Sequence, residues 1–145
     1  MRSPVPFVAV RTGGLVLLDV AATSLGDLLP SEGGANIGFG LLVFLALVVA
    51  ASVWAARDGR RGGRAGTRLP PLAACWAAVV VLVAAATAVW ISVGSALHGG
   101  GSSLEVLASD LRSVTPFTAG LIGVPALVAL ALVHSGTRPE GSAAR

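Results

Sequence analysis

The sequence predicts an all-α membrane protein, a four-helix up-down transmembrane bundle. The 145 residues are 54% hydrophobic and only 12% charged, with a mean hydropathy of +0.85. The apolar residues also form long blocks that contain no charge. A domain in water carries about 25% charged residues, because a wetted surface needs them. These apolar blocks therefore suit the hydrocarbon interior of a membrane. The length of the chain suits a single domain.

The first span is predicted over residues 4–28. The apolar segment here contains Arg11 and Asp19, and a charge near the centre of a span costs about 2.5–3.5 kcal/mol on the insertion scale. A secretory signal peptide with Arg2 in its basic region is the alternative interpretation. Asp19 would then lie inside the apolar region of that signal, which argues against it, so we expect a transmembrane helix.

Three further spans are predicted over residues 35–56, 70–97 and 114–135, each from a run without charge. The shortest of these runs has 22 residues, which form a helix of roughly 33 Å. That length crosses the ~30 Å hydrocarbon core of a bilayer. A proline pair at 70–71 and Pro116 are expected in first turns, where a missing N–H costs little.

The loop charges predict the orientation. Residues 57–68 (RDGRRGGRAGTR) hold five Arg and one Asp, so the positive-inside rule predicts a cytoplasmic loop. Four spans then place both termini in the cytoplasm, with a flexible tail over 137–145. Three spans would put Arg2 and Arg11 outside, which fits the rule less well. All ten basic residues are Arg, a bias typical of GC-rich bacterial genomes, so we expect a bacterial plasma membrane.

The last outer loop, residues 98–112, is predicted to contain a short amphipathic helix on the membrane surface. Ser102 and Glu105 have the spacing of a capping box, and the apolar residues that follow share one helical face. The third span carries a row of small residues, which favours close helix packing. This row consists of Ala74, Ala78, Ala85, Ala88, Ser92 and Ser95. Random Ala enrichment is an equal alternative, and either way we expect the third span to be central.

Asp19 is the main candidate for chemistry. A carboxylate in hydrocarbon is costly, and such groups commonly face the interior of a bundle. Thr23 shares its helical face, Arg11 lies two turns earlier, and Thr87 is expected at a similar depth. One hypothesis is a protonatable site or a counter-charge for a substrate. The other is a structural carboxylate held by Arg11 or by hydroxyl groups. For Arg11 itself, extension toward the cytoplasmic headgroups is the favoured interpretation, and a pairing role is the alternative.

The basic residues of the loop have a simpler interpretation. They set topology and contact anionic lipid, at roughly 1 kcal/mol per arginine near the surface. The loop has no aromatic residue to stack on bases, so nucleic acid is not an expected partner. The residues concerned are Arg57, Arg60, Arg61, Arg64 and Arg68.

No cofactor or metal site is expected. His98 and His134 are predicted at opposite ends of the bundle, each near an interface, and Cys75 is the single cysteine. Trp54 and Trp76 are expected at the cytoplasmic interface, where indoles are favoured. No catalytic motif occurs, so an enzyme is the least supported class.

Two functions remain open. The first is a non-enzymatic accessory or assembly subunit that packs against a larger membrane complex or a second copy. The second is a small oligomeric transporter, coupled to protons or cations through Asp19. Four spans with an acid in the first resemble the layout of small multidrug exporters. In those exporters the acid lies among aromatic residues, whereas this chain has no Tyr and few aromatics near Asp19.

Overall fold

The computed structural model describes residues 4–27, 37–97 and 104–137, and within these ranges it contains helices and no strand. Each helix is long and apolar enough to cross a membrane, which confirms the predicted all-α bundle. The four helices are α1 (Pro4–Asp27), α2 (Ile37–Arg64), α3 (Leu69–Leu97) and α4 (Leu104–Gly136).

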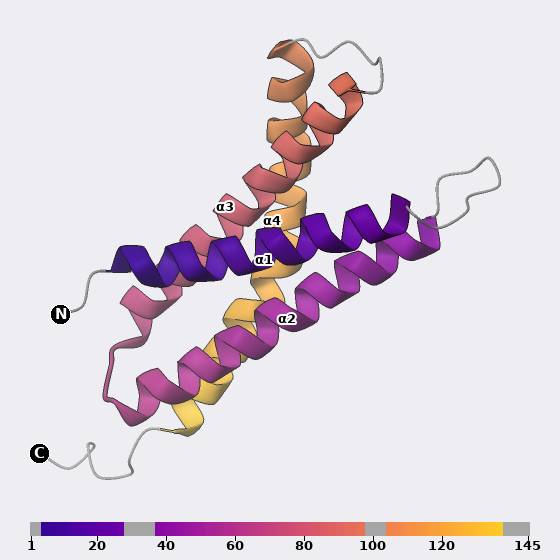
Figure 1. The fold of residues 1–145 in the computed structure, drawn as a ribbon. Helices are drawn as coiled ribbons and strands as arrows, with labels where there is room; N and C mark the ends of the chain where they lie inside the picture. Colours follow the sequence, from indigo (N-terminus) through magenta and orange to yellow (C-terminus); the bar gives the residue numbers. More distant parts are fainter. Residues whose placement is uncertain (1–3, 28–36, 98–103, 138–145) are drawn as a thin grey trace, which may run out of the picture.

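The helices form two hairpins that meet at one end and diverge toward the other (Figure 1). The beginning of α1, the connection between α2 and α3, and the end of α4 lie together. We call this the arginine end, because α2 finishes there with Arg57, Arg60, Arg61 and Arg64. α1 packs against α2 and α3 but makes no contact with α4, whereas α2 and α4 form the most extensive helix pair.

The prediction of an arginine-rich loop over residues 57–68 is wrong, because α2 continues to Arg64. Gly66 ends the helix with a φ of 65°, a conformation that glycine adopts without steric cost. The N–H of Gly66 donates to the carbonyl of Gly63 at 3.2 Å, and that of Thr67 donates to Gly62 at 2.9 Å. These two bonds form a Schellman motif, so the connection to α3 is only residues 65–68.

A row of small residues explains why α2 stays helical through so many glycines. Ala51, Ala55, Gly59 and Gly63 recur every fourth residue and are all buried, whereas the four arginines beside them are exposed. A Cβ on Gly59 would lie 2.7 Å from the backbone oxygen of Leu130 in α4. The glycines therefore allow the backbones of α2 and α4 to approach closely.

The short helix predicted for the last outer loop is not a separate element. Residues 104–111 are helical but continue without interruption into the span as α4, so Pro116 lies inside this helix and not at its start. A helix within a membrane tolerates such prolines because neighbouring groups satisfy the freed carbonyl. Ser102, the proposed cap, falls outside the described residues.

The row of small residues on α3 that was expected to pack against other helices is only partly buried. Ala88 and Ser92 are buried, but Ala74 and Ala78 are exposed. Trp76 is fully buried instead and belongs to the central apolar cluster, so it is not an interfacial anchor as predicted. Gly123 of α4 fits closely against Val80 of α3, whose Cγ1 would lie 3.0 Å from an added Cβ.

Replacing Gly59 with Ala tests the close approach of α2 to α4. The new methyl group would collide with backbone, which cannot rotate away, so we expect the free energy of unfolding to fall by about 1–3 kcal/mol. Gly40→Ala on the same helix is the control, because no atom of another described element lies within 4 Å of its Cβ position. Gly40→Ala should raise the free energy of unfolding by about 0.5–1 kcal/mol. Denaturant unfolding in detergent, followed by Trp fluorescence, measures both, and equal effects would contradict the packing argument.

Candidate polar sites in the membrane spans

Arg11 of α1 forms an ion pair with Asp58 of α2 near the arginine end. Nη2 of Arg11 lies 2.8 Å from Oδ1 of Asp58, and Nε lies 3.1 Å from Oδ2. The guanidinium and the carboxylate therefore meet in the bidentate arrangement that gives arginine pairs their strength and direction. The Asp58 side chain is only 5% exposed, and that of Arg11 is 20% exposed.

Aromatic rings enclose the Arg11 guanidinium beside this ion pair. Its central carbon lies 5.2 Å from the ring centroid of Trp54 and 5.5 Å from that of Phe7. Both distances are within the range of cation–π attraction. The Trp54 ring also lies against Gly14, where a Cβ would come within 2.6 Å of it. α1 and α2 are thus held together by charge, ring contact and close packing at one level.

This pairing differs from both hypotheses for Arg11, which were extension toward the headgroups and an ion pair with Asp19. Asp58 was not among the candidate site residues, because one acid among five arginines resembles a solvated loop charge. It lies four residues after Trp54 and three after Ala55, but only the structure shows that Ala55 is buried. Residues at these spacings share a helical face, which places the carboxylate toward the bundle and not toward water.

Asp19 is held by Thr87, which the sequence analysis expected at the same depth. The hydroxyl of Thr87 on α3 donates to Oδ2 of Asp19 at 2.7 Å, and Asp19 is 9% exposed. Thr23 donates to the backbone carbonyl of Asp19 one turn earlier and not to its carboxylate. Of the four residues proposed as one polar site, the structure joins Asp19 and Thr87, while Arg11 belongs to the other pair.

A small cavity borders the Asp19–Thr87 contact between α1 and α3. Its volume is about 260 Å³. Apart from Asp19 and Thr87, its lining is apolar, with valines, Ala86 and Trp90. The carboxylate therefore adjoins an apolar space, and no second ionisable group lines it among the described residues.

Two buried side-chain rings have three nitrogens without a hydrogen-bond partner among the described residues. His134 is 1% exposed, and neither of its ring nitrogens has a partner among the described residues. Its Nδ1 would lie 3.5 Å from a Cβ added at Gly62, so the ring is packed against α2. It lies in the last turn of α4, at the end of the helix where it was predicted. Nε1 of the buried Trp76 also lacks a partner among the described residues.

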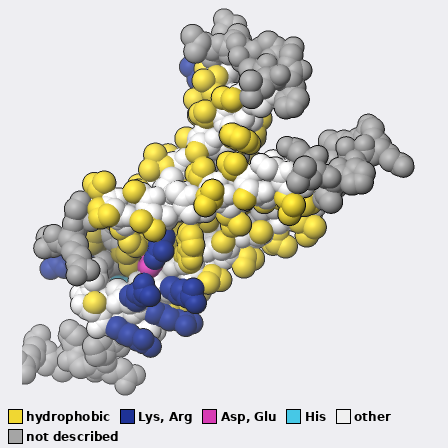
Figure 2. Space-filling model, in the orientation of Figure 1, with side chains coloured by type: hydrophobic (Ala, Val, Ile, Leu, Met, Phe, Trp, Pro, Cys, Tyr) yellow, Lys and Arg dark blue, Asp and Glu magenta, His cyan; other side chains and the backbone are white. Residues whose placement is uncertain are grey.

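The remaining arginines of α2 face outward. Arg57, Arg60, Arg61 and Arg64 are exposed on one side of the helix, and Arg68 is exposed in the connection. Figure 2 shows basic side chains gathered at this end, while hydrophobic side chains cover most of the remaining described surface in that view. The expected basic patch is therefore present, but a helix presents most of it instead of a loop.

The described residues contain no group of three His, Cys, Asp or Glu side chains that could hold a metal ion. His98 lies outside the described residues. Comparison of the chain with protein-family models, with curated proteins and with solved structures gave no match.

Removing either partner of the Arg11–Asp58 pair should destabilise the fold. Arg11→Met leaves a buried carboxylate without its cation, and Asp58→Leu leaves the cation without its anion. Such changes cost about 3–5 kcal/mol each, and the double variant should recover much of the loss. Arg57→Met, at an exposed arginine of the same helix, is the control. If both single variants unfolded in detergent like the control, the pair would have no structural role.

The hydrogen bond between Thr87 and Asp19 predicts that its two partners differ in how much their replacement lowers stability. Thr87→Val keeps the shape of the side chain but removes the donor to a buried oxygen, which should cost about 1–3 kcal/mol. Asp19→Asn keeps an acceptor oxygen for the same hydroxyl, so it should change stability by less than Thr87→Val. The same unfolding measurement in detergent checks both variants. A larger loss from Asp19→Asn would show that the negative charge itself stabilises the bundle.

Proposed function

We propose that this protein is a non-enzymatic accessory or assembly subunit of a membrane complex. The observation that supports this proposal is that the paired polar side chains within the spans bind one another. Arg11 is bound to Asp58 and Asp19 to Thr87, and both contacts join helices of this chain to one another. Contacts of this kind fix how the helices pack against one another. An assembly subunit needs such a fixed shape but does not need a water-lined path through the membrane.

The exposed surface supports the same proposal. Large apolar side chains are exposed along all four helices, including Leu17, Leu41, Trp90 and Phe117. The two hairpins diverge away from the arginine end (Figure 1), so each presents its own apolar faces to the membrane. Association between helices in lipid depends on such faces packing closely, and a second copy or a larger complex are the proposed partners.

A small proton- or cation-coupled transporter is the second candidate. Asp19 lies within a span and adjoins the cavity of about 260 Å³ between α1 and α3, and acids in such positions commonly serve ion pathways. The apolar lining of this cavity favours the first proposal, because a hydrated route to the carboxylate would need more polar groups.

The proposed location is a bacterial plasma membrane with both termini in the cytoplasm. The exposed arginines of α2 and Arg68 lie at the end where α1 begins and α4 finishes. The positive-inside rule assigns such an end to the cytoplasm, where anionic headgroups would contact it.

Proton flux and particle size together distinguish the two functions. The purified chain in liposomes with a trapped pH-sensitive dye should not dissipate an imposed pH gradient. The tagged chain, extracted from its own membranes in polymer-bounded lipid discs, should give particles larger than the purified chain in the same discs. Flux that Asp19→Asn abolishes, together with particles of equal size, would favour the transporter and contradict the accessory role.

Leu18→Asn is the matched control for the flux measurement. It introduces the same amide one residue away, at a side chain that is 37% exposed and does not line the Asp19 cavity. If both amide variants changed flux equally, the change would come from the altered helix. Flux lost with Asp19→Asn alone would assign it to the carboxylate.

A further inference from the structure

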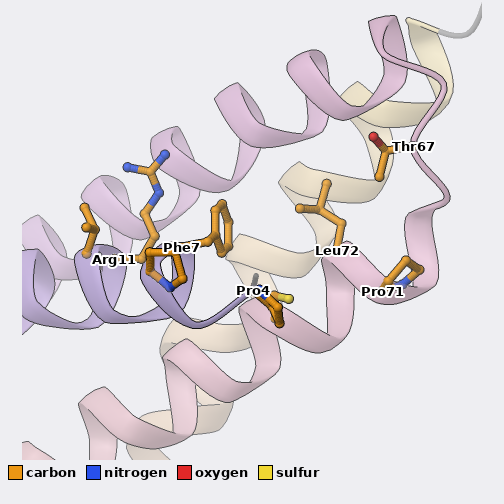
Figure 3. Close-up of a pocket in the computed structure, with 9 residues that line it drawn as sticks. Pro4, Phe7, Arg11, Thr67, Pro71 and Leu72 are labelled. Atoms are coloured by element: carbon orange, nitrogen blue, oxygen red, sulfur yellow. The ribbon is translucent and has the colours of Figure 1, made fainter. Parts of the chain in front are cut away.

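A second and larger cavity lies between the beginning of α1 and the beginning of α3. Its volume is about 580 Å³, within the range of sites that hold small molecules. Figure 3 shows Pro4 and Phe7 of α1 on one side, with Pro71 and Leu72 of α3 on the other. We call this space the α1–α3 groove. Its lining is mainly apolar, which suits a hydrocarbon chain.

Arg11 lines the α1–α3 groove, and Arg68 lies between two of its lining residues in the chain. Arg11 contributes to its lining, and the ion pair with Asp58 uses only Nε and Nη2, so Nη1 lies outside that pair. Thr67 and Pro71 form another part of the wall, and the exposed Arg68 lies between them in the chain. The Schellman turn at Gly66 sets the position of this segment.

We propose that the α1–α3 groove binds one anionic diacyl phospholipid, with an acyl chain between the helices and the phosphate beside Arg68. The arrangement combines the two properties that such a ligand needs: an apolar slot between two helices, and arginine side chains at the arginine end of the bundle. Basic pockets between helices at the cytoplasmic side commonly hold anionic headgroups. The proposal is independent of whether the chain is an assembly subunit or a transporter.

A second apolar groove on the same molecule shows what distinguishes the α1–α3 groove from a surface that any lipid would cover. Another apolar groove on α2, lined by Leu42, Leu45 and Val49 among others, has a similar volume of about 500 Å³. No arginine lines it. If apolar shape alone selected lipid, both grooves would take any phospholipid equally. Arg11 lines the α1–α3 groove directly, whereas it meets the α2 groove only through the Trp54 ring. We therefore expect a stronger preference for anionic lipid in the α1–α3 groove.

Cys75 provides a direct reporter, because it lines the α1–α3 groove and is the single cysteine of the chain. The purified full chain in detergent is titrated with phosphatidylglycerol or phosphatidylcholine while alkylation of Cys75 by a maleimide is followed. We expect phosphatidylglycerol to slow the reaction at lower concentrations than phosphatidylcholine. Arg68→Gln should raise the phosphatidylglycerol concentration for half-protection by about fivefold, the effect of one arginine near a charged surface.

The control places the thiol at the same depth but outside the groove. Ala74→Cys combined with Cys75→Ser moves it one residue, to an exposed position that does not line the groove. Its alkylation should respond equally to both lipids, which separates occupancy from the general effect of a charged micelle on thiol reactivity.

Three results would overturn the proposal. The first is equal protection of Cys75 by the two lipids, which would assign the groove to apolar contact without headgroup selection. The second is protection by glycerophosphate alone, which would indicate a phosphate site that needs no acyl chain. The third is the same selective protection at the control cysteine, which would place the effect in the micelle and not in the groove.

Discussion

The close approach of α2 to α4 is the constraint on which the other contacts depend. Small residues recur every fourth position from Ala51 to Gly63, and they bring the α2 backbone against Leu130 and His134. This contact continues the helix beyond its apolar run and fixes its rotation. Asp58 is then turned into the bundle, where a carboxylate needs a cation. Arg11 supplies it, and α1 is thereby attached to the end of α2.

α1 is held at two levels by two different helices. The ion pair at Arg11 joins it to α2, and the hydrogen bond at Asp19 joins it to α3. Eight residues separate these points, which correspond to about 12 Å along a helix. A helix fixed in this way lies across both partners, and this agrees with its lack of contact with α4. The two polar contacts thus determine how the hairpins cross.

The sequence predicted the spans better than their ends and their partners. Uncharged length is a property of each segment alone, so the last three helices could be predicted from it. The first helix, which contains Arg11 and Asp19, was predicted from the balance of charges across the membrane. Helical rise placed Asp19 and Thr87 at a similar depth. The helical state of residues 57–64 could not be predicted, because five arginines and four glycines in the twelve residues 57–68 indicate a loop unless another backbone is known to need the glycines. Burial of Asp58, Trp76 and His134 likewise depends on helix rotation, which α4 determines.

The two buried carboxylates differ in the kind of partner they have. Asp58 faces a guanidinium, which is always charged, so this contact is an ion pair between α1 and α2. Asp19 accepts a hydrogen bond from the neutral hydroxyl of Thr87, so its contact with α3 needs no opposite charge. Removing a charge therefore bears directly on the contact between α1 and α2, whereas removing a hydroxyl donor bears on the contact between α1 and α3.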